Sequence, residues 1–151
     1  MPKVIVDTNV LVSSLIQHRY PFLVIDYLFA NKEIELCNSD NLLSEYTQVL
    51  SRVKFFKYPD FDMRAKILLL NIKEFGTKYS TNVRLNIIED EADNRFLELA
   101  ETCNADYLIT GNTKHFPMKE YKGTRIISPR GILGNCSIIN FSVWVNQMKK
   151  R

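Results

Sequence analysis

Residues 3–17 read KVIVDTNVLVSSLIQ, and this stretch decides the fold class. Residues 3–6 are a short β-branched run of the kind that forms a buried strand. Asp7 follows at once, and Asn9 is a plausible N-cap for a helix over residues 10–17. The stretch therefore predicts a buried strand that turns directly into a helix, with a carboxylate at the junction.

The alternation of strand and helix continues along the chain. Short β-rich runs predict further strands over residues 33–37, 82–86, 107–110 and 125–128. Helical periodicity predicts helices over residues 22–31, 42–52, 62–75 and 92–104, and a short turn or helix after Pro129. Strands that alternate with helices predict an α/β fold, a three-layer α/β/α sandwich around a mostly parallel sheet.

Length and composition fit one globular domain. The chain has 151 residues, of which 46% are hydrophobic, and its net charge of +3 permits a nucleic-acid partner without demanding one. We assign residues 1–136 to the α/β domain and residues 137–151 to a C-terminal extension. The extension carries several apolar residues and a basic end, residues 148–151, and we expect it to be helical.

The cysteines and the absence of long apolar runs indicate in which cellular compartment the protein is expected. No apolar run approaches the roughly 20 residues that a membrane helix needs, and no cleavable targeting segment is recognisable. The odd, scattered cysteines are typical of small buried residues rather than of disulfides or a zinc site. They are Cys37, Cys103 and Cys136. We therefore expect a cytoplasmic protein.

Asp7 is the first candidate site residue. It follows the first predicted strand, and open α/β sheets bind ligands at the carboxyl ends of their strands. The alternative is that the Asp7 carboxylate only caps the following helix.

Glu45 is the second candidate. In the helix predicted over residues 42–52, Glu45 shares one face with Leu42, Tyr46 and Val49. A carboxylate within an apolar stripe is costly to bury unless it is paired or bound to a metal. The alternative is that Glu45 lies at the edge of the stripe and pairs with a lysine or arginine.

Asp93 is the third candidate, in the acidic run over residues 89–93. It shares a helix face with apolar residues at positions 96, 97 and 100, so it points toward the core. Glu89 and Glu91 are explained by the preference of acids for helix N-termini, and Asp90 is placed to cap the helix.

Asn112 follows the strand predicted over residues 107–110, so it and Thr110 are expected at the same edge of the sheet. Asp106 precedes that strand and is expected to be structural. Three carboxylates that meet at one edge repel each other unless a cation lies between them, and all-oxygen ligands suit Mg²⁺ or Mn²⁺. Such an ion lowers the pKa of a bound water.

These residues resemble the PIN-domain family, and most closely the toxins of bacterial toxin–antitoxin pairs, the VapC-like group. The resemblance spans nearly the whole chain, in family order. Its pieces are VIVDTNVLVSSL at 4–15, LLSEYTQVL at 42–50, EDEADNRFLELA at 89–100, ADYLITGN at 105–112 and RIISPRGIL at 125–133.

The resemblance implies a metal-dependent endoribonuclease that hydrolyses RNA phosphodiester bonds with Mg²⁺ or Mn²⁺. It implies that Asp7, Glu45 and Asp93 are catalytic and hold the metal. The polar residues that it implies for the cleft are Thr8, Asn9, Thr110 and Asn112. It also implies a homodimer and a protein antitoxin as partner.

The sequence departs from the family at position 112, where the family often has a fourth acid. Asn112 offers a carbonyl oxygen but no charge. Nearby Lys114 and His115, and also Arg130, are weaker candidates for substrate contacts. The segment over residues 52–58 interleaves basic and aromatic residues, which suits either RNA binding or ordinary packing.

Two other functions compete with the ribonuclease. A phosphohydrolase with an aspartyl nucleophile needs an acid two residues after Asp7, where this chain has Asn9. A catalytically weak or inactive PIN-like module that binds RNA or protein is favoured by Asn112. It predicts that divalent metal does not raise the melting temperature.

Overall fold

A computed structural model describes residues 1–17 and 19–132. Within them a sheet has the strand order β3-β2-β1-β4-β6-β5. All neighbouring strands are parallel except β5, which is antiparallel to β6. The strands are β1 (Lys3–Val6), β2 (Glu35–Asn38), β3 (Thr77–Lys78), β4 (Tyr107–Ile109), β5 (Glu120–Tyr121) and β6 (Thr124–Ile127).

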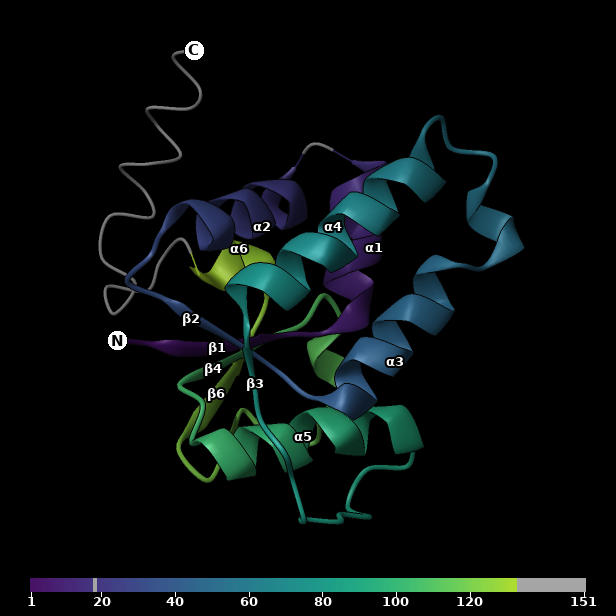
Figure 1. The fold of residues 1–151 in the computed structure, drawn as a ribbon. Coiled ribbons are helices and arrows are strands. Elements are labelled where there is room, and N and C mark those ends of the chain that lie inside the picture. The colour runs from purple at the N-terminus through teal and green to yellow at the C-terminus, as the bar shows by residue number, and fades with distance from the viewer. Residues whose placement is uncertain (18, 133–151) are drawn as a thin grey trace.

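Helices cover both faces of this sheet. They are α1 (Thr8–Ile16), α2 (Tyr20–Ala30), α3 (Asp40–Leu50), α4 (Phe61–Phe75), α5 (Glu91–Cys103) and α6 (Pro129–Ile132). Two short 3₁₀ turns are η1 (Val53–Phe55) and η2 (Thr113–His115). Figure 1 shows α2, α4 and α6 above the strands and α5 below them, which confirms the predicted three-layer sandwich.

The core lies around the central strands β1 and β4. Val4, Ile5 and Leu108 have no exposed surface, as expected for a parallel sheet that is buried on both faces. Cys37 and Cys103 are buried and free, which agrees with their predicted role as small core residues, while Cys136 lies outside the described residues.

The strand predicted over residues 82–86 is wrong. In this region buried side chains of α5 take the backbone donors that a strand would use. Glu98 accepts from the Leu85 amide (2.8 Å), and Asn94 accepts from the amides of Ile87 (3.0 Å) and Ile88 (2.9 Å). The strand at this edge of the sheet is β3 instead.

The predicted N-cap of the first helix is also wrong. The cap position is occupied by Asp7, and Asn9 lies within α1. The Asp7 side chain makes no cap hydrogen bond, so the alternative role of this carboxylate as a cap is not realised.

The short β5–β6 hairpin was not predicted. It turns through Lys122 and Gly123, which both have positive φ (46° and 88°), as a tight two-residue hairpin turn requires.

The C-terminal extension predicted over residues 137–151 lies outside the described residues, as does its boundary at residue 136. Among the helices of the described part, none has the length and apolar character needed to cross a membrane.

Candidate functional site

The carboxyl ends of β1 and β4 lie side by side in the sheet. After β1 the chain crosses to β2 on one side of this pair, and after β4 it continues to β5 and β6 on the other side. Val6 pairs with Ile109, so the residues that follow each strand, Asp7 and Thr110, are neighbours. The Thr110 hydroxyl donates to Asp7 Oδ2 (2.7 Å), and the Asp7 amide donates to the Ile109 carbonyl (2.8 Å). This is the switch point of the sheet, where α/β folds bind ligands.

Asn9 joins the two loops at this edge. Its Nδ2 donates to Asp7 Oδ2 (3.3 Å) and to the Thr110 hydroxyl (3.5 Å), and its Oδ1 accepts from the Gly111 amide (2.9 Å). A Cβ added at Gly111 would lie 3.2 Å from Asn9 Oδ1, so glycine permits this close approach. Asn9 thus orients the Asp7 carboxylate rather than capping a helix.

The Asp7 carboxylate is buried, and its charge is only partly compensated. Burial raises its pKa above the ordinary value, and the negative charge of Glu45 adds to this rise. The hydrogen bond from Thr110 and the nearby backbone amides of Thr8 and Asn9 oppose it. The Thr8 hydroxyl is buried without a hydrogen-bond partner in the described part of the chain.

Glu45 is held near this edge by its neighbour on α3. The Tyr46 hydroxyl donates to the Val6 carbonyl, one residue before Asp7, and the ring of Tyr46 lies 6.4 Å from that of Phe96 on α5. Glu45 itself is half-buried, and its charge raises the pKa of Asp7 and Asp93. The three acids therefore lie within electrostatic range of one another.

The alternative for Glu45, a surface ion pair, is not realised. Within residues 1–17 and 19–132, no lysine or arginine pairs with it. Arg84 and Arg95 line the same groove as Glu45, but they pair with Glu91 and Glu98. Glu45 therefore has no ion-pair partner among the described residues.

Asp93 occupies the first turn of α5 and is 6% exposed. Burial raises its pKa to about 6, helped by the charges of Asp7, Asp90 and Glu45 and opposed by His115. Asp90 caps the helix through the Ala92 amide (3.0 Å), as predicted, so Asp93 is not needed there. Its Oδ2 atom is buried without a hydrogen-bond partner among the described residues.

The loop after β4 brings two further candidates to Asp93. Asn112 Nδ2 lies 2.9 Å from His115 Nε2, and His115 Nδ1 lies 3.7 Å from Asp93 Oδ2. Lys114 and His115 also line a groove of ≈ 520 Å³ together with Asp93. Arg130 is exposed on α6, the helix that packs against α2, and its contact with substrate stays a prediction.

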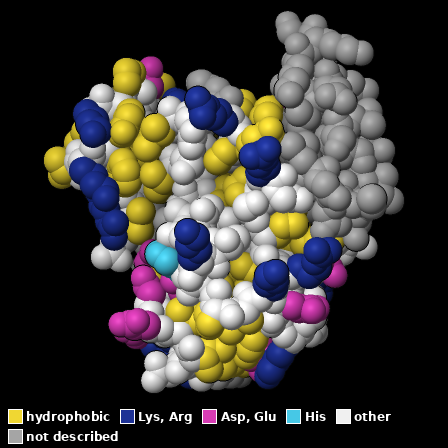
Figure 2. Space-filling view, turned by 180° about the vertical axis from the view of Figure 1, so that it is seen from behind, with side chains coloured by type: hydrophobic (Ala, Val, Ile, Leu, Met, Phe, Trp, Pro, Cys, Tyr) yellow, Lys and Arg dark blue, Asp and Glu magenta, His cyan; other side chains and the backbone are white. Residues whose placement is uncertain are grey.

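Basic side chains do not form one continuous patch on the face shown in Figure 2. Lysines and arginines are spread across it, and a histidine lies against acidic side chains. In the segment over residues 52–58, Phe55 packs inward against Phe61 (centroids 4.9 Å apart), while Phe56 is exposed. The interleaved aromatic residues therefore divide between the core and the surface.

Sequence reasoning missed the buried polar residues of α5. Asn94 and Glu98 are each 1% exposed, and Glu98 pairs with Arg95 (2.9 Å). Through their hydrogen bonds to the backbone of residues 85–88, Asn94 and Glu98 hold the segment that precedes Asp93 against α5. The available signal was their spacing of four residues beside the apolar stripe, but position alone does not distinguish buried polar groups from surface ones.

The chemical types of these donors suit a divalent cation, but their side chains are not gathered around one point. In the described part of the chain, no three His, Cys, Asp or Glu side chains are close enough together to hold an ion as they stand. Asp93 Oδ2 is buried and accepts no hydrogen bond from the described residues, although His115 Nδ1 lies 3.7 Å away. Together with the raised pKa of Asp7 and Asp93, it marks negative charge that is only partly compensated. Carboxylate and amide oxygens are the ligands that Mg²⁺ and Mn²⁺ prefer.

Comparison with known proteins found a match to a family model and a similar protein sequence. Residues 3–114 match the family model described as the PIN domain. The chain is also 30% identical over 111 residues to an uncharacterized protein of Methanocaldococcus jannaschii, a match that covers 73% of this chain and 70% of that protein.

Proposed function

We propose that this chain, which belongs to the PIN-domain family, is a metal-dependent endoribonuclease that hydrolyses RNA phosphodiester bonds. The family has a nuclease fold, and its members typically use divalent metals. The observation that carries the proposal is the buried Oδ2 of Asp93, which accepts no hydrogen bond from the described residues and lies within electrostatic range of Asp7 and Glu45. Burying such charge without a counterion is costly, so its accumulation at the ligand-binding edge of the sheet favours a cation site.

In this proposal Asp7, Glu45 and Asp93 hold Mg²⁺ or Mn²⁺, and Asn112 offers a carbonyl oxygen as a further ligand. The bound ion supplies an activated water and neutralises charge on the phosphate. The chain's own residues prepare the site. Thr110 and Asn9 orient the Asp7 carboxylate, and Tyr46 fixes the helix that carries Glu45.

Substrate contacts are proposed for the loop after β4. Lys114 is exposed in the groove that Asp93 lines, so its positive charge is placed to attract an RNA phosphate near the acids. His115 lies between Asn112 and Asp93, where its ring can contact the same phosphate.

The biological role follows from the resemblance to VapC-like toxins. On that ground we propose that the protein is the toxin of a toxin–antitoxin pair, is neutralised by a protein antitoxin and forms a homodimer. The free, buried Cys37 and Cys103 support a reducing compartment, and we propose the cytoplasm.

A second candidate, a PIN-like module that binds RNA or protein without cutting RNA, is favoured by Asn112. The amide cannot supply the fourth negative charge that the family often has, and Asn112 lies beside His115 rather than beside a carboxylate. The aspartyl phosphohydrolase is not supported, because the side-chain amide of Asn9 cannot act as a general acid. Its Oδ1 accepts a hydrogen bond from the Gly111 amide.

Cleavage of labelled RNA separates the two candidates. We expect the protein to cut single-stranded or hairpin RNA with Mg²⁺ or Mn²⁺ and to lose this activity in EDTA. Glu45→Gln keeps the size of the side chain and removes its charge, so it should lower the rate strongly. RNA binding without cleavage in either metal, across several RNAs, would favour the binding module and refute the nuclease.

A further inference from the structure

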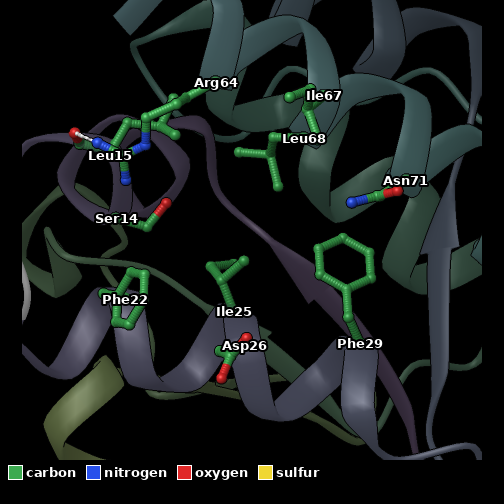
Figure 3. A pocket seen from close by; sticks show the side chains of 10 residues that line it. All are labelled: Ser14, Leu15, Phe22, Ile25, Asp26, Phe29, Arg64, Ile67, Leu68 and Asn71. Atoms are coloured by element: carbon green, nitrogen blue, oxygen red, sulfur yellow. Dashed lines mark hydrogen bonds between the residues drawn. The ribbon is translucent and has the colours of Figure 1, made fainter. Parts of the chain in front are cut away.

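A groove separates α2 from α4 on the helical layer above the sheet, and α1 closes one end of it. Figure 3 shows side chains of α2 and α4 facing each other across it, with Arg64 turned toward the end of α1, where it donates to the Leu15 carbonyl (2.9 Å). The groove has a volume of ≈ 190 Å³. It is lined mainly by apolar residues, which are Leu15, Phe22, Ile25, Phe29, Ile67 and Leu68.

The α4 side of this groove exposes more apolar surface than a solvent-facing helix should. Met63, Ile67 and Leu70 are 58%, 51% and 63% exposed, and their spacing places them on one face of α4. At the end of the helix, Phe75 is exposed and packs edge-on against Phe29 of α2 (centroids 6.4 Å apart). Exposed apolar surface of this kind marks an interaction face.

The path of the chain points to its own C-terminal segment as the cover of this face. The last described helix, α6, ends at Ile132 and packs against α2, which forms one wall of the groove. The chain continues for residues 133–151. Six residues of extended chain span about 20 Å, and α2 is about 16 Å long, so residues from 138 onward can reach any point along the groove.

The composition of that segment matches the groove. Residues 138–144 read IINFSVW and carry five apolar side chains, and the chain then ends in Lys149, Lys150 and Arg151. The groove contains the carboxylate of Asp26, and the exposed Glu74 lies near the end of α4. Its one lining cation, Arg64, donates to the Leu15 carbonyl, so its positive charge is held at the α1 end of the groove.

We propose that residues 138–144 of this chain lie in the α2–α4 groove and cover Phe29 and Ile67, with the basic end directed toward Asp26. The segment then belongs to the domain core rather than forming a separate extension. This proposal concerns a face formed by α2 and α4, and it does not depend on the nuclease function.

The sole tryptophan of the chain, Trp144, allows a direct test on the full-length protein. We expect its emission to be blue-shifted relative to the unfolded chain in urea, and its acrylamide quenching constant to be severalfold lower. Ile67→Glu places a charge in the groove and should restore the emission and quenching of the unfolded chain. Lys66→Glu changes an exposed neighbour on α4 and should leave both unchanged.

Three outcomes would overturn the proposal. Trp144 could be as accessible to acrylamide in the native protein as in urea. Its protection could survive Ile67→Glu in a protein whose circular dichroism is native, which would place the segment elsewhere. Its protection could also disappear on dilution together with a change from dimer to monomer, which would assign the groove to a second copy.

Discussion

Asp7→Asn is expected to reduce metal-dependent RNA cleavage by about 10³-fold or more, which corresponds to about 4 kcal/mol of lost transition-state stabilisation. The amide oxygen can still accept the hydrogen bond from Thr110, so the loop geometry is retained. The substitution removes the charge that we assign to metal binding at the switch point of the sheet. The measurement is kcat/KM for a labelled RNA in Mg²⁺ and in Mn²⁺.

The matched control is Asp106→Asn. This acid lies at the opposite edge of the sheet, where its Oδ2 accepts from the Lys3 amide (2.8 Å), a contact that an amide oxygen also makes. We expect it to leave kcat/KM close to that of the wild type. Equal cleavage by the wild type and Asp7→Asn would refute the assignment of Asp7.

Asp93→Asn is expected to stabilise the metal-free protein at pH 8 by about 2–3 kcal/mol. The pKa of Asp93 rises from 3.8 to about 6 on folding, chiefly because the carboxylate is buried. The folded protein therefore binds the proton more tightly than the unfolded chain. The stability that this proton provides is present below pH 4 and is lost as the pH rises from about 4 to 6.

The measurement is urea unfolding in EDTA over a range of pH. The free energies of unfolding of Asp93→Asn and the wild type should differ most above pH 6 and converge near pH 4. At pH 8 the melting temperature should rise by roughly 4–12 °C. Glu89→Gln, a change of an exposed acid in the same groove, serves as the control. A difference that is independent of pH would show that burial of the Asp93 charge is not the cause.

Much of the site could be predicted because local sequence determines which face of an element a residue occupies. Asp7 follows the buried run at residues 3–6. The helical spacing around Glu45 and around Asp93 placed each of them on the apolar face of its helix. Every predicted strand and helix that the structure contains begins and ends within two residues of its prediction. Asp106 was assigned correctly to the opposite edge by the direction of its strand.

The parts that could not be predicted depend on contacts between distant segments. Residues 82–86 look like a strand, but Glu98 of α5 accepts from the Leu85 amide, and Asn94 of α5 accepts from the amides of Ile87 and Ile88 just beyond them. Asn9 looks like a helix cap, but besides Asp7 its partners are Thr110 and Gly111 of the loop after β4, about one hundred residues away in the chain. Nothing in the local pattern around Ile67 distinguishes it from Leu68, yet one is exposed and the other is buried.

Direct titration of the protein with Mn²⁺, followed by calorimetry at pH 7.5, tests most simply whether Asp7 after β1, Glu45 on α3 and Asp93 in the first turn of α5 form a cation site. We predict saturable binding to a single site, weakened by about tenfold or more in each of Asp7→Asn, Glu45→Gln and Asp93→Asn. Absence of binding by the wild type, or equal binding by all four proteins, would contradict the metal centre.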